Sequence, residues 1–152
     1  MEVANTFVRS PQARRDGPGF IRSAAPGSVA TYARSINATG SIAGFYYDAS
    51  NVPHGYVRKP DGTITAFDPK GSYATIAENI DSKGVITGFY ANQFKNISGF
   101  VRSAGGKITS FGPSESEFTY PMSISAKGRI AGYYVAAVGN PEQQGFVRIP
   151  RR

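Results

Sequence analysis

The sequence predicts an all-β domain built from an internal repeat. Three stretches that begin at Ile36, Ile80 and Ile124 share the pattern I-x-x-x-G-x-I-x-G-aromatic-Y, and both offsets are 44 residues (80−36 and 124−80). Short runs rich in β-branched and aromatic residues recur with these stretches, and turn residues separate the runs roughly every 8–12 residues, as in all-β domains. A period of this length that extends along the chain is typical of repeat architectures.

Each unit divides into four runs, which we name a, b, c and d. In the second unit they are d, Ala74–Ile80; a, Ile86–Tyr90; b, Gly99–Arg102; and c, Lys107–Phe111. Run b recurs as HGYVR from His54, QGFVR from Gln144 and NTFVR from Asn5. In chain order the runs are b c, d a b c, d a b c and d a b, which makes three four-stranded units plus one extra strand. The chain therefore begins and ends in the middle of a unit.

The turns between runs have a chemical basis. Runs d and a are joined by Asn37–Gly40, Asp81–Gly84 and Ser125–Gly128. Asn, Asp or Ser at the first position and Gly at the fourth is the type I turn pattern, in which the first side chain bonds the backbone two residues on. Such tight connections predict antiparallel neighbours.

Run d has a competing interpretation as a helix, because residues 72–83 contain no Gly or Pro. The equivalent residues 117–127 contain Pro121, and a proline inside a helix costs about 3 kcal/mol. Since equivalent runs share one structure, run d is predicted to be a strand. Pro121 is then expected at an edge position, because it cannot donate to a ladder.

At these residues the chain resembles the HAF-type extracellular repeats, whose pattern is matched by Ile36–Phe67, Ile80–Phe111 and Ile124–Arg148. The resemblance implies propeller-like blades of four antiparallel strands and, usually, export. It implies no settled activity and no catalytic residues. The segment MEVANTFVRS lacks the apolar core of a signal peptide, so localisation stays open.

One domain covering 1–152 is expected, with units at about 6–50, 51–94 and 95–138 and an extra strand at 144–150. Three blades are too few for a propeller, which typically has about 4–8. A homodimer would supply six, and its terminal runs would complete the unfinished sheet. The alternative is a β-trefoil, which also uses three four-stranded repeats and closes as a monomer.

Composition excludes several kinds of chemistry. The chain has no Cys and one His, so disulfides, thiolate nucleophiles and zinc sites built from several His residues are absent. No apolar run approaches the roughly 18 residues that span a bilayer. The net charge of +7 suits an anionic polysaccharide or surface. We do not expect nucleic acid as a partner, because no Lys/Arg run exceeds two residues and no nucleic-acid-binding signature is present.

Two repeated sets of residues predict a multivalent binding module for a glycan or another anionic small ligand. Tyrosines that offer flat ring faces recur at Tyr46, Tyr90 and Tyr134. Arginines that suit carboxylate or sulfate recur at Arg58, Arg102 and Arg148. Each set also has a structural interpretation, as strand packing or as a solvated face.

The alternative is a calcium-dependent hydrolase of a lactone, ester or glycoside, by analogy of fold alone. His54 is its candidate general base, although a loop histidine needs no catalytic role. No cofactor is required, but calcium held by oxygens from several units would leave no linear motif. The candidate oxygen donors are Asn37, Asn79, Asp81 and Asn92.

Overall fold

The structure is a computed structural model of the chain, and it describes residue 19, residues 23–136 and residues 142–150. All regular elements in these ranges are β-strands, so the all-β prediction is confirmed. These described ranges contain no helix long and apolar enough to cross a membrane. The run b predicted at Asn5–Arg9 lies outside the described residues.

The strands follow the predicted order of runs. Unit 1 consists of β1 (Ala30–Ile36), β2 (Ile42–Tyr47), β3 (Pro53–Arg58) and β4 (Ile64–Phe67). Unit 2 consists of β5 (Ser72–Ile80), β6 (Ile86–Asn92), β7 (Ile97–Arg102) and β8 (Ile108–Phe111). Unit 3 consists of β9 (Ser116–Ile124), β10 (Ile130–Ala136) and β11 (Gln143–Arg148). Run d is therefore a strand in every unit and not a helix.

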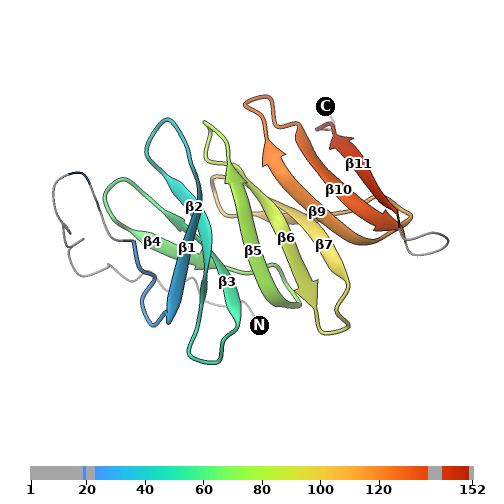
Figure 1. Cartoon of the computed structure of the whole chain (residues 1–152). Helices are drawn as coiled ribbons and strands as arrows, with labels where there is room; N and C mark the ends of the chain where they lie inside the picture. The colour runs from blue at the N-terminus through green and yellow to red at the C-terminus, as the bar shows by residue number, and fades with distance from the viewer. Residues whose placement is uncertain (1–18, 20–22, 137–141, 151–152) are drawn as a thin grey trace.

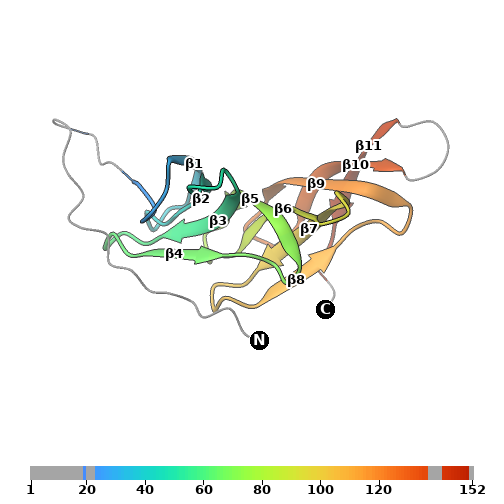
Figure 2. The ribbon, with the colours of Figure 1, turned by 90° about the horizontal axis from the view of Figure 1, so that it is seen from below.

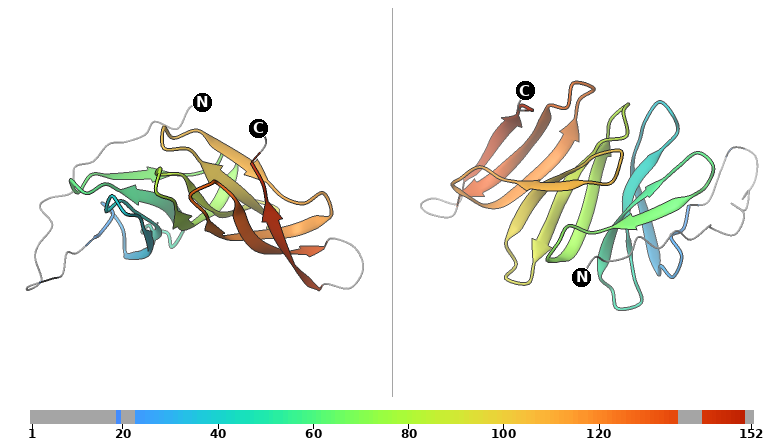
Figure 3. Two further views of the ribbon diagram at one scale, coloured as in Figure 1. Left: turned by 90° about the horizontal axis from the view of Figure 1, so that it is seen from above. Right: turned by 180° about the vertical axis from the view of Figure 1, so that it is seen from behind.

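Within each unit, consecutive strands pair antiparallel, so that β1-β2-β3-β4 form one sheet. Units 2 and 3 count as one seven-stranded sheet, because β7 and β9 share a parallel bridge between Ile97 and Phe118. The units follow one another from β1 to β11 (Figure 1), and the view from below shows their sheets inclined to each other (Figure 2). Seen from behind, β4 and β8 lie nearest the viewer (Figure 3, right).

The d-a turns form as predicted. The Asn37 side-chain Oδ1 accepts the Thr39 N–H at 3.2 Å, and the Asp81 Oδ1 accepts the Lys83 N–H at 2.8 Å. Gly84 closes its turn with φ of 80°, in the left-handed region that favours glycine. These local bonds fix the hairpin between the first two strands of units 1 and 2, and in unit 3 the Ser125 hydroxyl accepts the Arg129 N–H, four residues on.

The first strand of each unit contains a bulge at the same place. The ladder skips one residue between Ala33 and Ser35 in β1, and one between Ala77 and Asn79 in β5. Opposite the bulge of β5 lies Gly88, whose missing Cβ would stand 2.1 Å from the carbonyl oxygen of Ile76. The bulge therefore brings the backbones so close that a side chain at position 88 has no room.

The two faces of each sheet differ. We call the face turned toward the preceding unit the leading face, and the face turned toward the following unit the trailing face. The leading face of unit 1 carries Tyr46, Tyr56 and Arg58, and its trailing face carries Ala43 and Phe67, because residues opposite each other in the ladder share a face. The main core lies between the trailing face of unit 1 and the leading face of unit 2. Its buried residues are Ala43, Phe67, Ala77, Ile80, Ile86 and Phe100.

The junction between units 2 and 3 repeats that packing. The Phe67 and Phe100 rings lie 5.8 Å apart at the first junction, and the Phe111 and Phe146 rings lie 6.2 Å apart at the second. Unit 3 differs from the others at its outer edge, because among the described residues no strand corresponding to β4 or β8 lies beside β11. Phe146 is therefore only half-buried, whereas Phe100 is fully buried.

Candidate functional site

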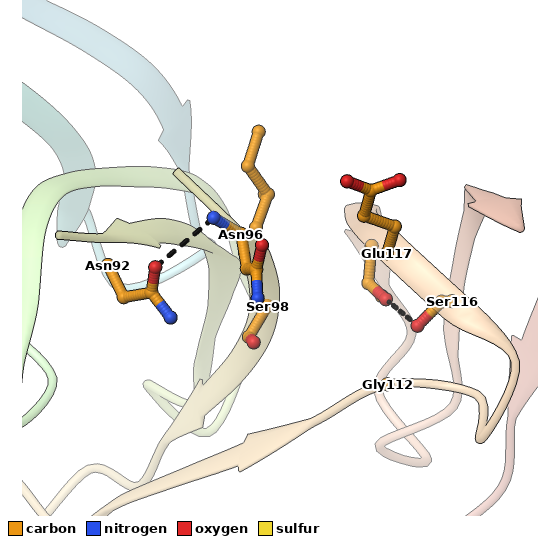
Figure 4. Close-up of a pocket in the computed structure, with 8 residues that line it drawn as sticks. Asn92, Asn96, Ser98, Gly112, Ser116 and Glu117 are labelled. Carbon is orange, nitrogen blue, oxygen red and sulfur yellow. Dashed lines mark hydrogen bonds between the residues drawn. The ribbon is translucent and has the colours of Figure 1, made fainter. Parts of the chain in front are cut away.

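A polar pocket of about 460 Å³ opens between units 2 and 3, at the end of the sheets where runs a and b are joined (Figure 4). One wall belongs to the hairpin that joins β6 to β7, and the other to the loop that leads into β9. The lining residues are Asn92, Asn96, Ile97, Ser98, Gly112, Ser116, Glu117 and Thr119.

Local hydrogen bonds fix the first wall. The Asn92 Oδ1 accepts from the backbone N–H of Phe94 at 2.9 Å and from that of Asn96 at 3.1 Å. Lys95 completes the turn with φ of 64°. This side-chain turn leaves the Asn92 amide nitrogen as a donor at the pocket wall (Figure 4).

The second wall depends on two hydroxyl groups and a glycine. The Ser116 hydroxyl donates to the Pro113 carbonyl at 2.8 Å and lies 2.8 Å from the Thr119 hydroxyl. A Cβ at Gly112 would stand 2.9 Å from the Thr119 Oγ1 and 3.0 Å from the Ser116 Oγ. A side chain at position 112 would therefore displace these hydroxyls and narrow the pocket. The exposed Glu117 carboxylate stands on this side of the opening, across from Asn96 (Figure 4).

The same place between units 1 and 2 contains a charged cluster. Subtracting 44 from Asn92, Ser98 and Gly112 gives Asp48, His54 and Asp68. The His54 Nδ1 lies 2.7 Å from an Asp68 carboxylate oxygen, and its Nε2 lies 3.4 Å from an Asp48 oxygen. The chain thus builds two versions of one inter-unit site, one acidic with a histidine and one polar and open.

The two aspartates determine the ionisation of the histidine. Burial alone would lower the pKa of His54, but hydrogen bonds and charges from Asp68, and then from Asp48, raise it above its ordinary value. The pKa of Asp48 is lowered, chiefly because its carboxylate accepts the Val52 N–H. Both ring nitrogens of His54 face a carboxylate, which leaves neither directed at a substrate. Its catalytic role stays a prediction that this geometry does not favour.

The predicted binding tyrosines lie beside this site in each unit. Tyr46 pairs across the ladder with His54, and their ring centroids are 5.4 Å apart. Tyr90 pairs with Ser98 of the pocket, and its hydroxyl lies 2.9 Å from the Ser110 hydroxyl. All three tyrosines are half-buried, and the third, Tyr134, donates to the Gln144 amide oxygen at 2.7 Å. The pKa of Tyr46 is raised, first by burial and then by the nearby carboxylates.

The predicted binding arginines lie on the same leading face but at the other end of the strands. Tyr46 pairs with His54, which lies four residues before Arg58 on β3. Four residues along a strand correspond to about 13 Å. Arg58 and Arg102 are only 8% and 7% exposed. The Arg102 guanidinium lies 4.8 Å from the centre of the Phe67 ring of the preceding unit, and Arg148 lies 4.8 Å from that of Phe111. This packing holds neighbouring units together, and a role for the arginines in ligand binding stays a prediction.

The candidate calcium donors have separate structural roles. Asn37 donates to the Asp81 carbonyl at 2.9 Å, at the d-a turns, whereas Asn92 lies at the opposite end of the sheets. The Asn79 Oδ1 accepts the Ile124 N–H at 3.3 Å. In the described part of the chain, no group of three or more His, Asp or Glu could hold a metal ion. Calcium binding, and the hydrolase that would need it, stay predictions without support in this geometry.

Sequence reasoning missed most of the pocket, because its walls come from different units. Asn96 and Glu117 belong to no motif, and Ser116 and Thr119 recur in the other units without a pattern that marks them as binding residues. One signal was available. Equivalent positions such as Asp48 and Asn92, or Asp68 and Gly112, differ in residue type between units, whereas the strands around them repeat. No protein-family model, curated protein or solved structure matches the chain, so the site is interpreted from its own residues.

Proposed function

We propose that the chain is a carbohydrate-binding module that holds a neutral, polyhydroxylated ligand in the pocket between units 2 and 3. The polar lining of this pocket carries the proposal. Amide groups of Asn92 and Asn96, hydroxyls of Ser98 and Ser116 and the Glu117 carboxylate surround one opening. Sugar hydroxyls both donate and accept hydrogen bonds, and these side chains offer both kinds of partner.

Charge and size narrow the ligand class. The lining contains one carboxylate and no Lys or Arg, which favours a neutral glycan over the anionic ligand that the net charge alone suggests. A volume of about 460 Å³ falls within the approximately 300–1,000 Å³ usual for small-molecule sites. Tyr90, next to Ser98 in the ladder, offers an aromatic surface beside the polar groups.

The propeller architecture is part of the same proposal. Each unit is an antiparallel meander, and the leading face of one unit packs on the trailing face of the unit before it, with an arginine over a phenylalanine at both junctions. Face-to-face stacking of this kind supports blades in a propeller and the resemblance to HAF-type repeats.

The test is an array of neutral and acidic oligosaccharides, followed by calorimetry with the strongest neutral binder. Replacing Glu117 by Ala removes a charged acceptor whose hydrogen bond contributes about 1.5–3 kcal/mol, so we expect affinity to fall roughly 10–150-fold. The matched control is Tyr73→Ala, at the equivalent exposed position of unit 2. A second variant, Gly112→Asp, introduces the residue that unit 1 carries there and should abolish binding. Absence of any neutral ligand, or equal effects of Glu117→Ala and Tyr73→Ala, would refute the proposed site.

A further inference from the structure

The first strands of neighbouring units (β1, β5 and β9) are joined by the same side-chain-to-backbone hydrogen bond at both junctions. The Ser35 hydroxyl of unit 1 accepts the Ile80 N–H of unit 2 at 3.4 Å. The Asn79 amide oxygen of unit 2 accepts the Ile124 N–H of unit 3 at 3.3 Å. Donors and acceptors are each 44 residues apart (124−80 and 79−35), so one docking geometry is used twice.

Ala25 packs on Tyr56 and Ile64 of the leading face of unit 1. Its first strand, β1, has no unit in front of it among the described residues. Ile36 is the equivalent of Ile80 and Ile124, and it is 66% exposed, whereas these are 5% and 7% exposed. Val29, just before the same strand, is exposed as well. An apolar residue that is buried at both internal junctions is therefore open at this one.

The trailing side of unit 3 is open in the complementary way. Ser123 is the next member of the series Ser35 and Asn79, and it is exposed. Val147 on the trailing face is 66% exposed, although its equivalents in units 1 and 2, Val57 and Val101, are half-buried. Eight large apolar residues are exposed among the described residues. Five of them lie in unit 3 or at the leading side of unit 1: Val29, Ile36, Met122, Val147 and Ile149.

We propose that these two surfaces dock on each other in a head-to-tail assembly of two copies of this chain. The Ser123 hydroxyl of one copy accepts the Ile36 N–H of the other, and Val147 is covered as Val57 is within the chain. The occupant is a second copy because the chain already contains both halves of the junction, in the geometry of its internal contacts. Two copies hold six units, within the approximately 4–8 blades that close a ring, so a heterologous contact ends in a closed particle and not in a fibre.

The assembly also builds another inter-unit site from both copies. Ser28 and Thr31 correspond to Ser116 and Thr119, and their hydroxyls lie 3.0 Å apart, as the pair in the pocket lies 2.8 Å apart. Gln144 occupies the ladder position of Ser98, opposite a tyrosine. Head-to-tail docking places Gln144 of one copy beside Ser28 and Thr31 of the other. This structural consequence does not depend on the identity of the ligand.

Sedimentation equilibrium of the whole chain tests the docking. We expect a mass of twice 16.2 kDa for the wild type. Ile36→Glu and Val147→Glu, both at exposed residues, should each give a 16.2 kDa monomer. Phe94→Glu, at an apolar residue that is 73% exposed but lies away from both surfaces, should keep the dimer. A monomeric wild type, or a dimer that survives Ile36→Glu, would overturn the proposal.

Mixing the two variants separates this geometry from a symmetric dimer. The Ile36→Glu copy keeps an intact trailing side, and the Val147→Glu copy keeps an intact leading side. Head-to-tail docking therefore predicts that the mixture regains a two-copy particle through one good junction, although neither variant dimerises alone. If the mixture stays at 16.2 kDa with both variants folded by circular dichroism, head-to-tail docking is wrong.

Discussion

The contrast between Phe100 and Phe146 tests how far the packing of unit 2 extends into unit 3. The two residues are equivalent in the repeat, but Phe100 is fully buried and Phe146 is half-buried. Truncating a buried phenylalanine to alanine costs about 3–5 kcal/mol. In a chain of this size, each kcal/mol shifts Tm by roughly 2–4 °C. We therefore expect Phe100→Ala to lower Tm by roughly 6–20 °C.

Phe146→Ala removes the same atoms from a site that lacks an outer strand. The Phe146 ring is already partly exposed to solvent, so the loss should be about 1–2 kcal/mol. Urea unfolding followed by circular dichroism, at equal concentrations of both variants and the wild type, measures the two losses. If Phe146→Ala is as destabilising as Phe100→Ala, a structure that the described residues do not contain covers β11, and the reasoning from its open edge fails.

Two further predictions concern the charged cluster and the bulge. As the single histidine, His54 gives one unambiguous imidazole NMR titration, and we expect a pKa above 6.5 because its two flanking aspartates outweigh burial. The stabilisation that it contributes is then complete below pH 6.5 and is lost as the pH rises through the folded-state pKa, so the stability difference between wild type and His54→Gln should shrink in that direction. Gly88→Ala should prevent folding, because its Cβ would lie 2.1 Å from the Ile76 carbonyl oxygen. The control Gly105→Ala, whose nearest neighbour is 3.9 Å away, should fold normally. A well-folded Gly88→Ala variant would show that the bulge can relax.

Local features of the fold were predictable from the sequence. Asn37 and Gly40 form their turn from bonds within five residues, and any sequence with that pattern has the same local chemistry. The strand at Ser116–Ile124 was predictable because Pro121 removes the helical alternative for all three units. The repeat then gave the order of the strands, because equivalent runs adopt equivalent structures.

The roles of particular side chains were less predictable, because they depend on the neighbouring unit. Alternation placed the arginines and tyrosines on a strand face, but it could not tell that Phe67 of unit 1 lies under Arg102 of unit 2. In the same way, Asn96 and Glu117 belong to different units, and they line one pocket only because the two sheets stack. The candidate site therefore needed the three-dimensional structure.

The bond from Ser35 or Asn79 to the next unit has a consequence for how such a chain changes over generations. One partner is a backbone N–H, which every residue except proline supplies whatever its side chain. The acceptor has already varied between a hydroxyl and an amide without loss of the contact. A duplicated or deleted unit would therefore join its new neighbour without a matched pair of substitutions. We expect the gain or loss of a whole 44-residue unit to be tolerated, and related chains to differ in length by that step.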